Sequence, residues 1–132
     1  MGRLLCVAVM LAAALFTGKP ALAQAFPSRP VTIIVPFPAG GPEDTIGRII
    51  AERMRTFLGQ PVLIENVGGA AGSIGVGRAV RAAPDGYTLS LGNWATHVVN
   101  SAIYPLNFDV LTDFDPVSVS YTHLTLPTNR EV

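Results

Sequence analysis

The stretch VTIIVPFPAGGPEDTIGRIIAERMRTFLG, residues 31–59, predicts a strand, a glycine turn and a helix in immediate succession. Residues 31–35 are β-branched and almost wholly apolar, which is typical of a strand covered on both faces in a parallel sheet. Apolar residues then recur at helical spacing from about residue 44 to residue 58, and Gly59 follows as a helix-ending glycine. Between them, Gly40 and Gly41 allow a tight turn whose N–H groups lie at the positive end of the helix dipole. This turn is a candidate site for a carboxylate or a phosphate.

The predicted helix is amphipathic. Its expected buried face comprises Ile46, Ile49, Ile50 and Phe57, and its expected solvent face comprises Glu52, Arg53 and Arg55.

The same alternation continues toward the C-terminus. We expect a buried strand at residues 61–66, a third strand at residues 87–92, and helices at about residues 73–82 and 97–103. Gly75 and Gly77 weaken the first of these helices by about 1 kcal/mol each relative to alanine. Strands that alternate with helices predict an α/β fold with a mostly parallel sheet.

Three loops follow the carboxyl ends of the predicted strands, which is where α/β sheets bind ligands. They are residues 37–44, the glycine-rich residues 67–73, and residues 93–97. Together they predict a polar pocket for a small anion. The candidate ligand-binding residues are Phe37, Ala39, Gly40, Gly41, Asp44, Gly72, Ser73, Trp94, Thr96 and His97.

Most of these candidates have a second interpretation. Asp44 could bind a ligand amine, orient the glycine turn, or simply favour the helix dipole. Ser73 could reach a carboxylate or cap a helix, and Trp94 could wall the pocket or belong to the core. His97 could be structural, and Thr96 and Asn93 could serve the backbone instead of a solute. The arginines on helix bodies are expected to be solvated: Arg48, Arg53, Arg55, Arg78 and Arg81.

The N-terminus predicts a secretory signal peptide over residues 1–23. Arg3 begins it, residues 4–16 are apolar, and residues 21–23 form a small-x-small cleavage site. The alternative is a transmembrane anchor, but the apolar run is shorter than the roughly 20 residues that a membrane-spanning helix needs. Cys6, the single cysteine, lies within this leader, so the mature chain is expected to have no disulfide.

The charge of the chain argues against one class of function, nucleic-acid binding. The chain of 132 residues has a formal net charge of 0, and loss of the leader would remove Arg3 and Lys19 and leave it slightly acidic. This balance gives no sign of nucleic-acid binding. We expect no catalytic residue, no metal and no cofactor.

Several motifs occur in order along the chain: PSRPVTIIVPFPAGG at residues 27–41, Asp44, GQPV at 59–62, Glu65-Asn66 and PDGYTL at 84–89. Over about residues 1–118, the sequence closely resembles the Bug-type receptors of tripartite tricarboxylate transporters. The resemblance implies a monomeric periplasmic receptor that closes two lobes around a small carboxylate and delivers it to a membrane permease. In that family, the loops that match residues 37–44 and 68–73 hold the carboxylate through backbone N–H groups and water.

The same resemblance divides the chain. Residues 24–118 would form part of the first lobe of a two-lobed periplasmic-binding-protein fold. Residues 119–132 depart from the family pattern and resemble translated adapter or vector DNA, so that His123 would have no function. The alternative is a genuine short tail.

Two enzyme classes fit less well. Residues 69–75 lack the G-x-G-x-x-G spacing of a dinucleotide site, and the chain has no G-K-[ST] of a P-loop. A hydrolase with Ser73 as its nucleophile would need a sharp turn directly off a strand, but several loop residues separate Asn66 from Ser73. A third possibility is a fragment without a function of its own.

Overall fold

The computed structural model describes residues 25–119. The predicted signal peptide, with Cys6, lies outside the described residues. So does the predicted tail, with His123, apart from Val119.

The centre of the molecule is a parallel sheet of three strands, as the sequence predicts. The strands are β1 (Val31–Val35), β2 (Val62–Asn66) and β3 (Thr88–Ser90), in the order β2-β1-β3. Ile33 of β1 pairs with Ile64 of β2 and with Leu89 of β3. β1 is therefore the central strand, and it carries the most buried side chains of the sheet.

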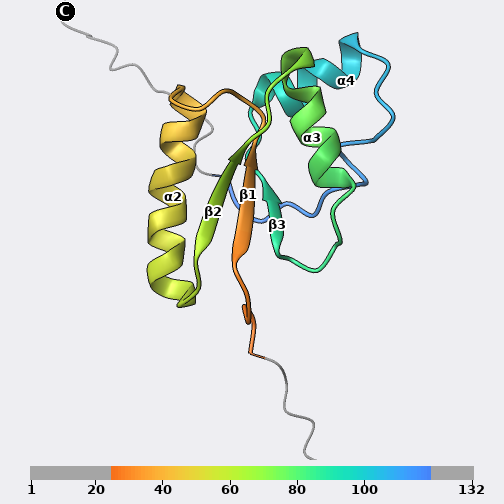
Figure 1. Cartoon of the computed structure of the whole chain (residues 1–132). Coiled ribbons are helices and arrows are strands. Elements are labelled where there is room, and N and C mark those ends of the chain that lie inside the picture. The colour runs from red at the N-terminus through yellow and green to blue at the C-terminus, as the bar shows by residue number, and fades with distance from the viewer. Residues whose placement is uncertain (1–24, 120–132) are drawn as a thin grey trace, which may run out of the picture.

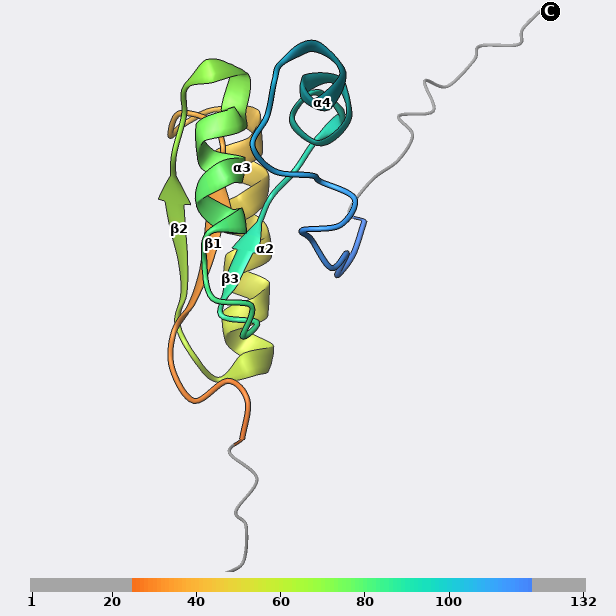
Figure 2. The same ribbon diagram turned by 90° about the vertical axis from the view of Figure 1, so that its right-hand side faces the viewer.

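Two helices cover opposite faces of this sheet (Figures 1 and 2). α2 (Pro42–Leu58) packs against β1 and β2, and α3 (Ser73–Val80) packs against β1 and β3. Gly59 ends α2 in the left-handed conformation with φ of 65°. The layered α/β arrangement predicted from the alternation of elements is confirmed.

Short elements complete the described chain. The 3₁₀ turn η1 (Ala70–Gly72) leads into α3, and the π-helical turn η2 (Ala95–Val99) continues into α4 (Asn100–Ile103). The helix predicted over residues 97–103 therefore begins earlier and with wider turns. No helix among residues 25–119 is long and apolar enough to cross a membrane.

The buried face of α2 differs from the prediction. Gly47 and Ala51 face the sheet, whereas Ile49 and Phe57 are 61% and 87% exposed. The helix lies so close to β1 that a Cβ on Gly47 would be 3.2 Å from Cγ2 of Val35. Small residues therefore occupy the closest contact. Ile50 packs against the core as predicted, whereas the prediction is wrong for Ile49 and Phe57.

The second strand also differs from its prediction. β2 is expected to be buried, but it is an edge strand and Leu63 is 53% exposed. Its apolar composition reflects the one face that packs on α2, through Val62 and Ile64.

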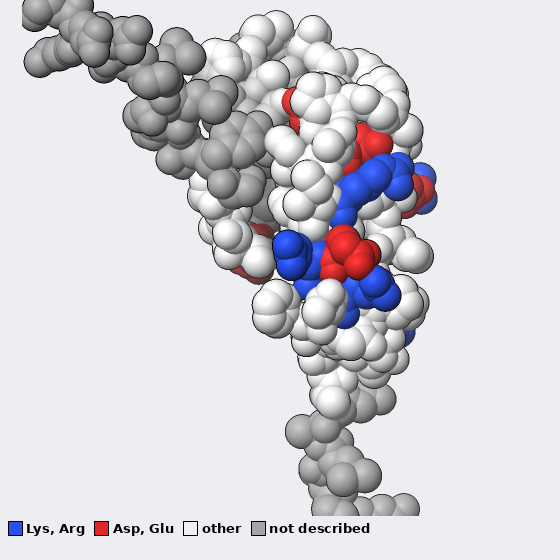
Figure 3. Space-filling view, turned by 90° about the vertical axis from the view of Figure 1, so that its left-hand side faces the viewer, with Lys and Arg blue, Asp and Glu red and all other residues white. Residues whose placement is uncertain are grey.

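On the α2 side, acidic and basic side chains lie close together across the middle of the described surface (Figure 3). Two ion pairs lie along α2, Asp44 with Arg48 and Glu52 with Arg55. Glu52, Arg53 and Arg55 are exposed, as predicted.

Candidate functional site

Three loops meet at the carboxyl edge of the sheet, the upper end in Figure 1. The Asn66 side-chain amide donates to the carbonyl of Phe37 at 3.1 Å and to Oδ1 of Asp44 at 3.0 Å. The Asn93 amide donates to Oε1 of Glu43 at 3.0 Å. The Asn100 amide donates to the carbonyl of Ala71 at 2.8 Å. Side-chain amides therefore tie the first loop to the end of β2, the third loop to the first, and α4 to the second.

Asp44 is the centre of the first loop. Its side chain is almost fully buried, and Oδ2 accepts hydrogen bonds from Nε of Arg48 at 2.9 Å and from the backbone N–H of Gly40 at 2.8 Å. The Arg48 hydrogen bond, helped by those from Gly40 and Asn66, lowers the pKa of Asp44 to about 2. Both carboxylate oxygens thus hold the loop, which supports the loop-orienting interpretation.

The glycine pair of this loop has two distinct parts. Gly40 adopts a φ of 85°, which favours glycine, and its N–H is committed to Asp44. Gly41 immediately precedes α2, whose first residue is Pro42. Ala39 is exposed and Phe37 is half-buried. The expected row of free N–H groups is therefore interrupted at Gly40.

The second loop carries four consecutive residues with positive φ. The values are 117° at Gly69, 47° at Ala70, 54° at Ala71 and 91° at Gly72. The two alanines have a Cβ atom in this region, which costs about 1–2 kcal/mol per residue. A strained backbone of this kind persists where the surrounding structure holds it in place, and it is common at ligand-binding and active sites.

Gly72 lies where a side chain would not fit. A Cβ there would be 2.6 Å from Cγ2 of Thr96 and 3.2 Å from the carbonyl oxygen of Pro36. Gly72, rather than Ser73, is the residue that caps α3, so the capping role considered for Ser73 is wrong. The Ser73 hydroxyl instead donates to the carbonyl of Ala70 at 2.7 Å.

The third loop is held by a reciprocal pair. Asn93 Oδ1 accepts from the N–H of Thr96 at 3.0 Å, and Thr96 Oγ1 accepts from the N–H of Asn93 at 3.1 Å. Thr96 is 1% exposed. Both side chains therefore serve the backbone at the start of η2, one of the two roles considered for them.

His97 and Trp94 have opposite environments. His97 is half-buried, with Nδ1 2.9 Å from Thr96 Oγ1 and its ring centroid 5.5 Å from that of Phe114. Burial lowers the pKa of His97 below its usual value. Trp94 is 73% exposed, so the core interpretation considered for it is wrong and its ring is available at the edge.

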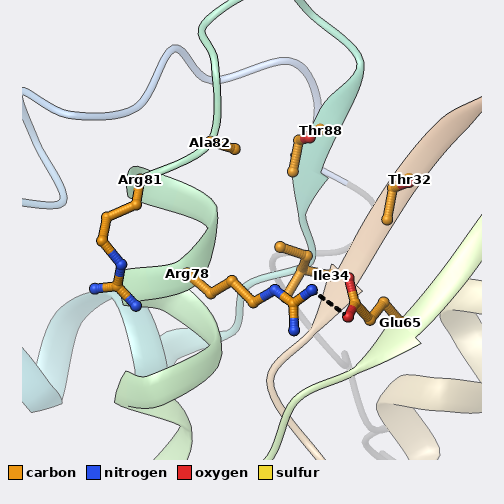
Figure 4. Close-up of a pocket in the computed structure, with 7 residues that line it drawn as sticks. All are labelled: Thr32, Ile34, Glu65, Arg78, Arg81, Ala82 and Thr88. Carbon is orange, nitrogen blue, oxygen red and sulfur yellow. Dashed lines mark ion pairs between the residues drawn. The ribbon is translucent and has the colours of Figure 1, made fainter.

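Two hollows of the described surface lie on the α3 side, and Ser73 at the end of the second loop lines one of them. One of about 370 Å³ lies on the α3 side of the sheet and is lined by residues that include Thr32, Thr88 and Arg78 (Figure 4). Arg78 reaches across it to Glu65 at 2.6 Å, and Arg81 points away from that pair. A second hollow, of about 270 Å³, lies between α3 and residues 105–108. The three loops were predicted to form a pocket, and on the described part of the chain they form an open edge of the sheet instead.

Sequence reasoning missed the amides that organise this edge, Asn66 and Asn100, and the carboxylate of Glu43. Asn66 at a strand end offered a weak signal, because it follows an apolar run directly. Asn100 offered none, since its partner Ala71 is 29 residues away. Within residues 25–119, no group of His, Cys, Asp and Glu could hold a metal ion.

Residues 46–127 match the model of the tripartite tricarboxylate transporter family receptor. The chain belongs to this receptor family. A UPF0065 protein in the TAR-I ttuE-ttuC' intergenic region of Agrobacterium vitis is 42% identical over 114 residues, which are 86% of this receptor chain and 33% of that protein. BugT of Bordetella pertussis is 39% identical over 135 residues, 100% of this chain and 41% of BugT.

A solved structure of a family relative shares the fold. MatC from Rhodopseudomonas palustris with bound malate is 47% identical, with a TM-score of 0.67, over 70% of this receptor chain and 32% of MatC. A structure described as a periplasmic transporter is 49% identical, with a TM-score of 0.63, over 65% of this chain and 29% of that one. The receptor chain thus spans about a third of the length of these relatives.

Proposed function

We propose that this chain supplies one wall of a carboxylate-binding cleft in a periplasmic solute receptor. The convergence of the three loops at the carboxyl edge of the sheet carries the proposal, because that edge is where α/β sheets bind ligands. The fold shared with malate-bound MatC supports a small carboxylate as the solute. The family of the chain supports delivery of this solute to a membrane permease as part of the proposal.

In this proposal the loops divide the work of binding. Backbone N–H groups near Ala39 and Gly41, and those of the second loop before Gly72, donate to the carboxylate, while Gly40 and Asp44 hold the first of these loops in shape. The N–H of Gly72 itself donates to the carbonyl of Gly69 at 2.9 Å, so Gly72 shapes the second loop. Phe37, Trp94, Ser73 and His97 line the cleft, whereas the buried Thr96 holds the third loop in shape through Asn93. Hydrogen bonds to a charged group strengthen when a second lobe closes and excludes water.

The test is calorimetry on the protein that carries this sequence, with malate, succinate, adipate and citrate. We expect saturable binding of at least one acid without turnover. At a concentration of about 100 Kd, the acid should add about 2.7 kcal/mol to the free energy of unfolding. Absence of binding across the panel, or formation of a product, would refute the proposal.

A matched pair of glycine variants tests the site. Gly72→Ala should weaken binding, because its Cβ would displace the loop against Thr96. Gly59→Ala carries the same positive-φ penalty at the other end of α2, with open space around its Cβ, and should leave affinity unchanged. Equal effects of the two variants on affinity would place the ligand elsewhere.

A further inference from the structure

The charge at the three loops is not what a simple anion site would have. The loops contain two carboxylates, Glu43 and Asp44, and no lysine or arginine. The charge of Asp44 is compensated by an ion pair with Arg48, whose Nε lies 2.9 Å from Oδ2 of Asp44. Glu43 has no ion-pair partner within residues 25–119, and its Oε1 accepts a hydrogen bond from the neutral amide of Asn93. One uncompensated negative charge therefore lies at the edge that we assign to an anion.

Glu43 is held in place at this edge. It is half-buried, and the Asn93 contact joins it to a loop 50 residues away in sequence. An acidic residue in the first turn of a helix also favours the dipole, but Asp44 already supplies that charge to α2. The dipole alone therefore does not explain why the Glu43 carboxylate is fixed to the third loop.

A fixed carboxylate discriminates between ligands by their chemistry. It accepts a charge-assisted hydrogen bond from an O–H or N–H group, and it repels a further carboxylate. We propose that Glu43 is a specificity-determining residue, which selects carboxylates that carry an adjacent hydroxyl or ammonium group. This inference rests on the proposed function, since it concerns the same cleft.

The test uses ligands that differ by one group, measured by calorimetry on the same receptor. Malate and aspartate differ from succinate by a hydroxyl and an ammonium group, and tricarballylate differs from glutarate by a carboxylate. We expect the wild type to bind malate or aspartate about tenfold more tightly than succinate, and to disfavour tricarballylate against glutarate. Glu43→Gln keeps an oxygen for Asn93, so it should remove most of the first preference and tighten tricarballylate about tenfold.

Two further variants make the result specific. Glu52→Gln removes a carboxylate from the exposed part of the same helix, where it pairs with Arg55, and should leave the ranking of ligands unchanged. Glu43→Asp retains the charge and should still discriminate against tricarballylate. Melting temperatures of all the variants establish that they are folded.

The outcomes separate the two proposals. If carboxylates bind and their ranking is the same in the wild type and in Glu43→Gln, this inference is wrong while the proposed function stands. A wild type that prefers succinate to both malate and aspartate would also overturn it. If no carboxylate binds to the wild type, both fail.

Discussion

One carboxylate, that of Asp44, fixes the geometry of the first loop. Its two oxygens bind a backbone N–H, a guanidinium and a side-chain amide, which come from Gly40, Arg48 and Asn66. These bonds hold the loop in shape without a contribution from a solute. This arrangement depends on the ionised form of Asp44, because the neutral acid accepts these bonds less well.

Asp44→Asn should therefore change how stability depends on pH. The folded-state pKa of Asp44, about 2, lies below its ordinary value of 3.8, so the charge contributes stability above about pH 4. That contribution is lost as the pH falls from about 4 to about 2. We expect urea unfolding to show the wild type more stable than Asp44→Asn at pH 6, with the difference vanishing near pH 2.

Glu52→Gln is the matched control for this prediction. Its carboxylate also pairs with an arginine, Arg55, which lowers the pKa of Glu52, but it is exposed and holds no loop. The stability of this variant should differ little from that of the wild type at either pH. A deficit of Asp44→Asn that stays constant down to pH 2 would contradict the role given to its charge.

The position of α3 depends on its glycines. A Cβ on Gly75 would be 2.5 Å from the carbonyl oxygen of Val67 and 2.9 Å from Cα of Pro36. Glycine is the residue that permits this approach of the helix to the first two loops. The weak helix propensity of Gly75 is thus outweighed by the contact it allows.

Gly75→Ala should destabilise the fold by about 3 kcal/mol, at the upper end of overpacking effects. Gly68→Ala is the control, because its Cβ would make ordinary contacts with Pro38 at 3.5 Å. Urea denaturation at neutral pH measures both. Equal losses of stability in the two variants would show that the close approach of α3 is not required.

The elements were predictable to different degrees, for physical reasons. The apolar run at residues 31–35 and the glycine after Leu58 determine β1 and the end of α2 locally, and both were predicted. The face of α2 was predicted only in part. Ile50 packs against the core, but the closest contacts with the sheet are made by Gly47 and Ala51, because the short distance leaves room only for small residues. The early start of η2 depends on the side chains of Asn93 and Thr96, which no periodicity reveals.

The candidate site was predictable as a region but not in its connections. Strand ends and glycines located the three loops, since parallel strands bring their carboxyl ends to one edge. The bonds between loops join residues 22 to 50 positions apart, such as Asn66 with Asp44 and Asn93 with Glu43. Contacts of that separation leave no local pattern in one sequence.

Across the described chain, stability should be highest at the centre of the sheet. β1 has neighbours on both sides and a helix on each face, whereas residues 104–119 contain no helix or strand and are mostly exposed. Amide hydrogen exchange should therefore be slowest in β1 and fastest in residues 104–119. Faster exchange in β1 than in either edge strand would contradict the central position of β1.

The amide bridges of Asn66, Asn93 and Asn100 have a consequence for the rate of binding. Each links one loop at the carboxyl edge to another element, so one loop cannot swing out without breaking a bond to its neighbour. A solute that reaches this edge meets an assembled surface and does not wait for a loop to order itself. If this wall binds the proposed carboxylate, the observed binding rate should therefore rise in proportion to solute concentration, without a plateau from a loop-ordering step.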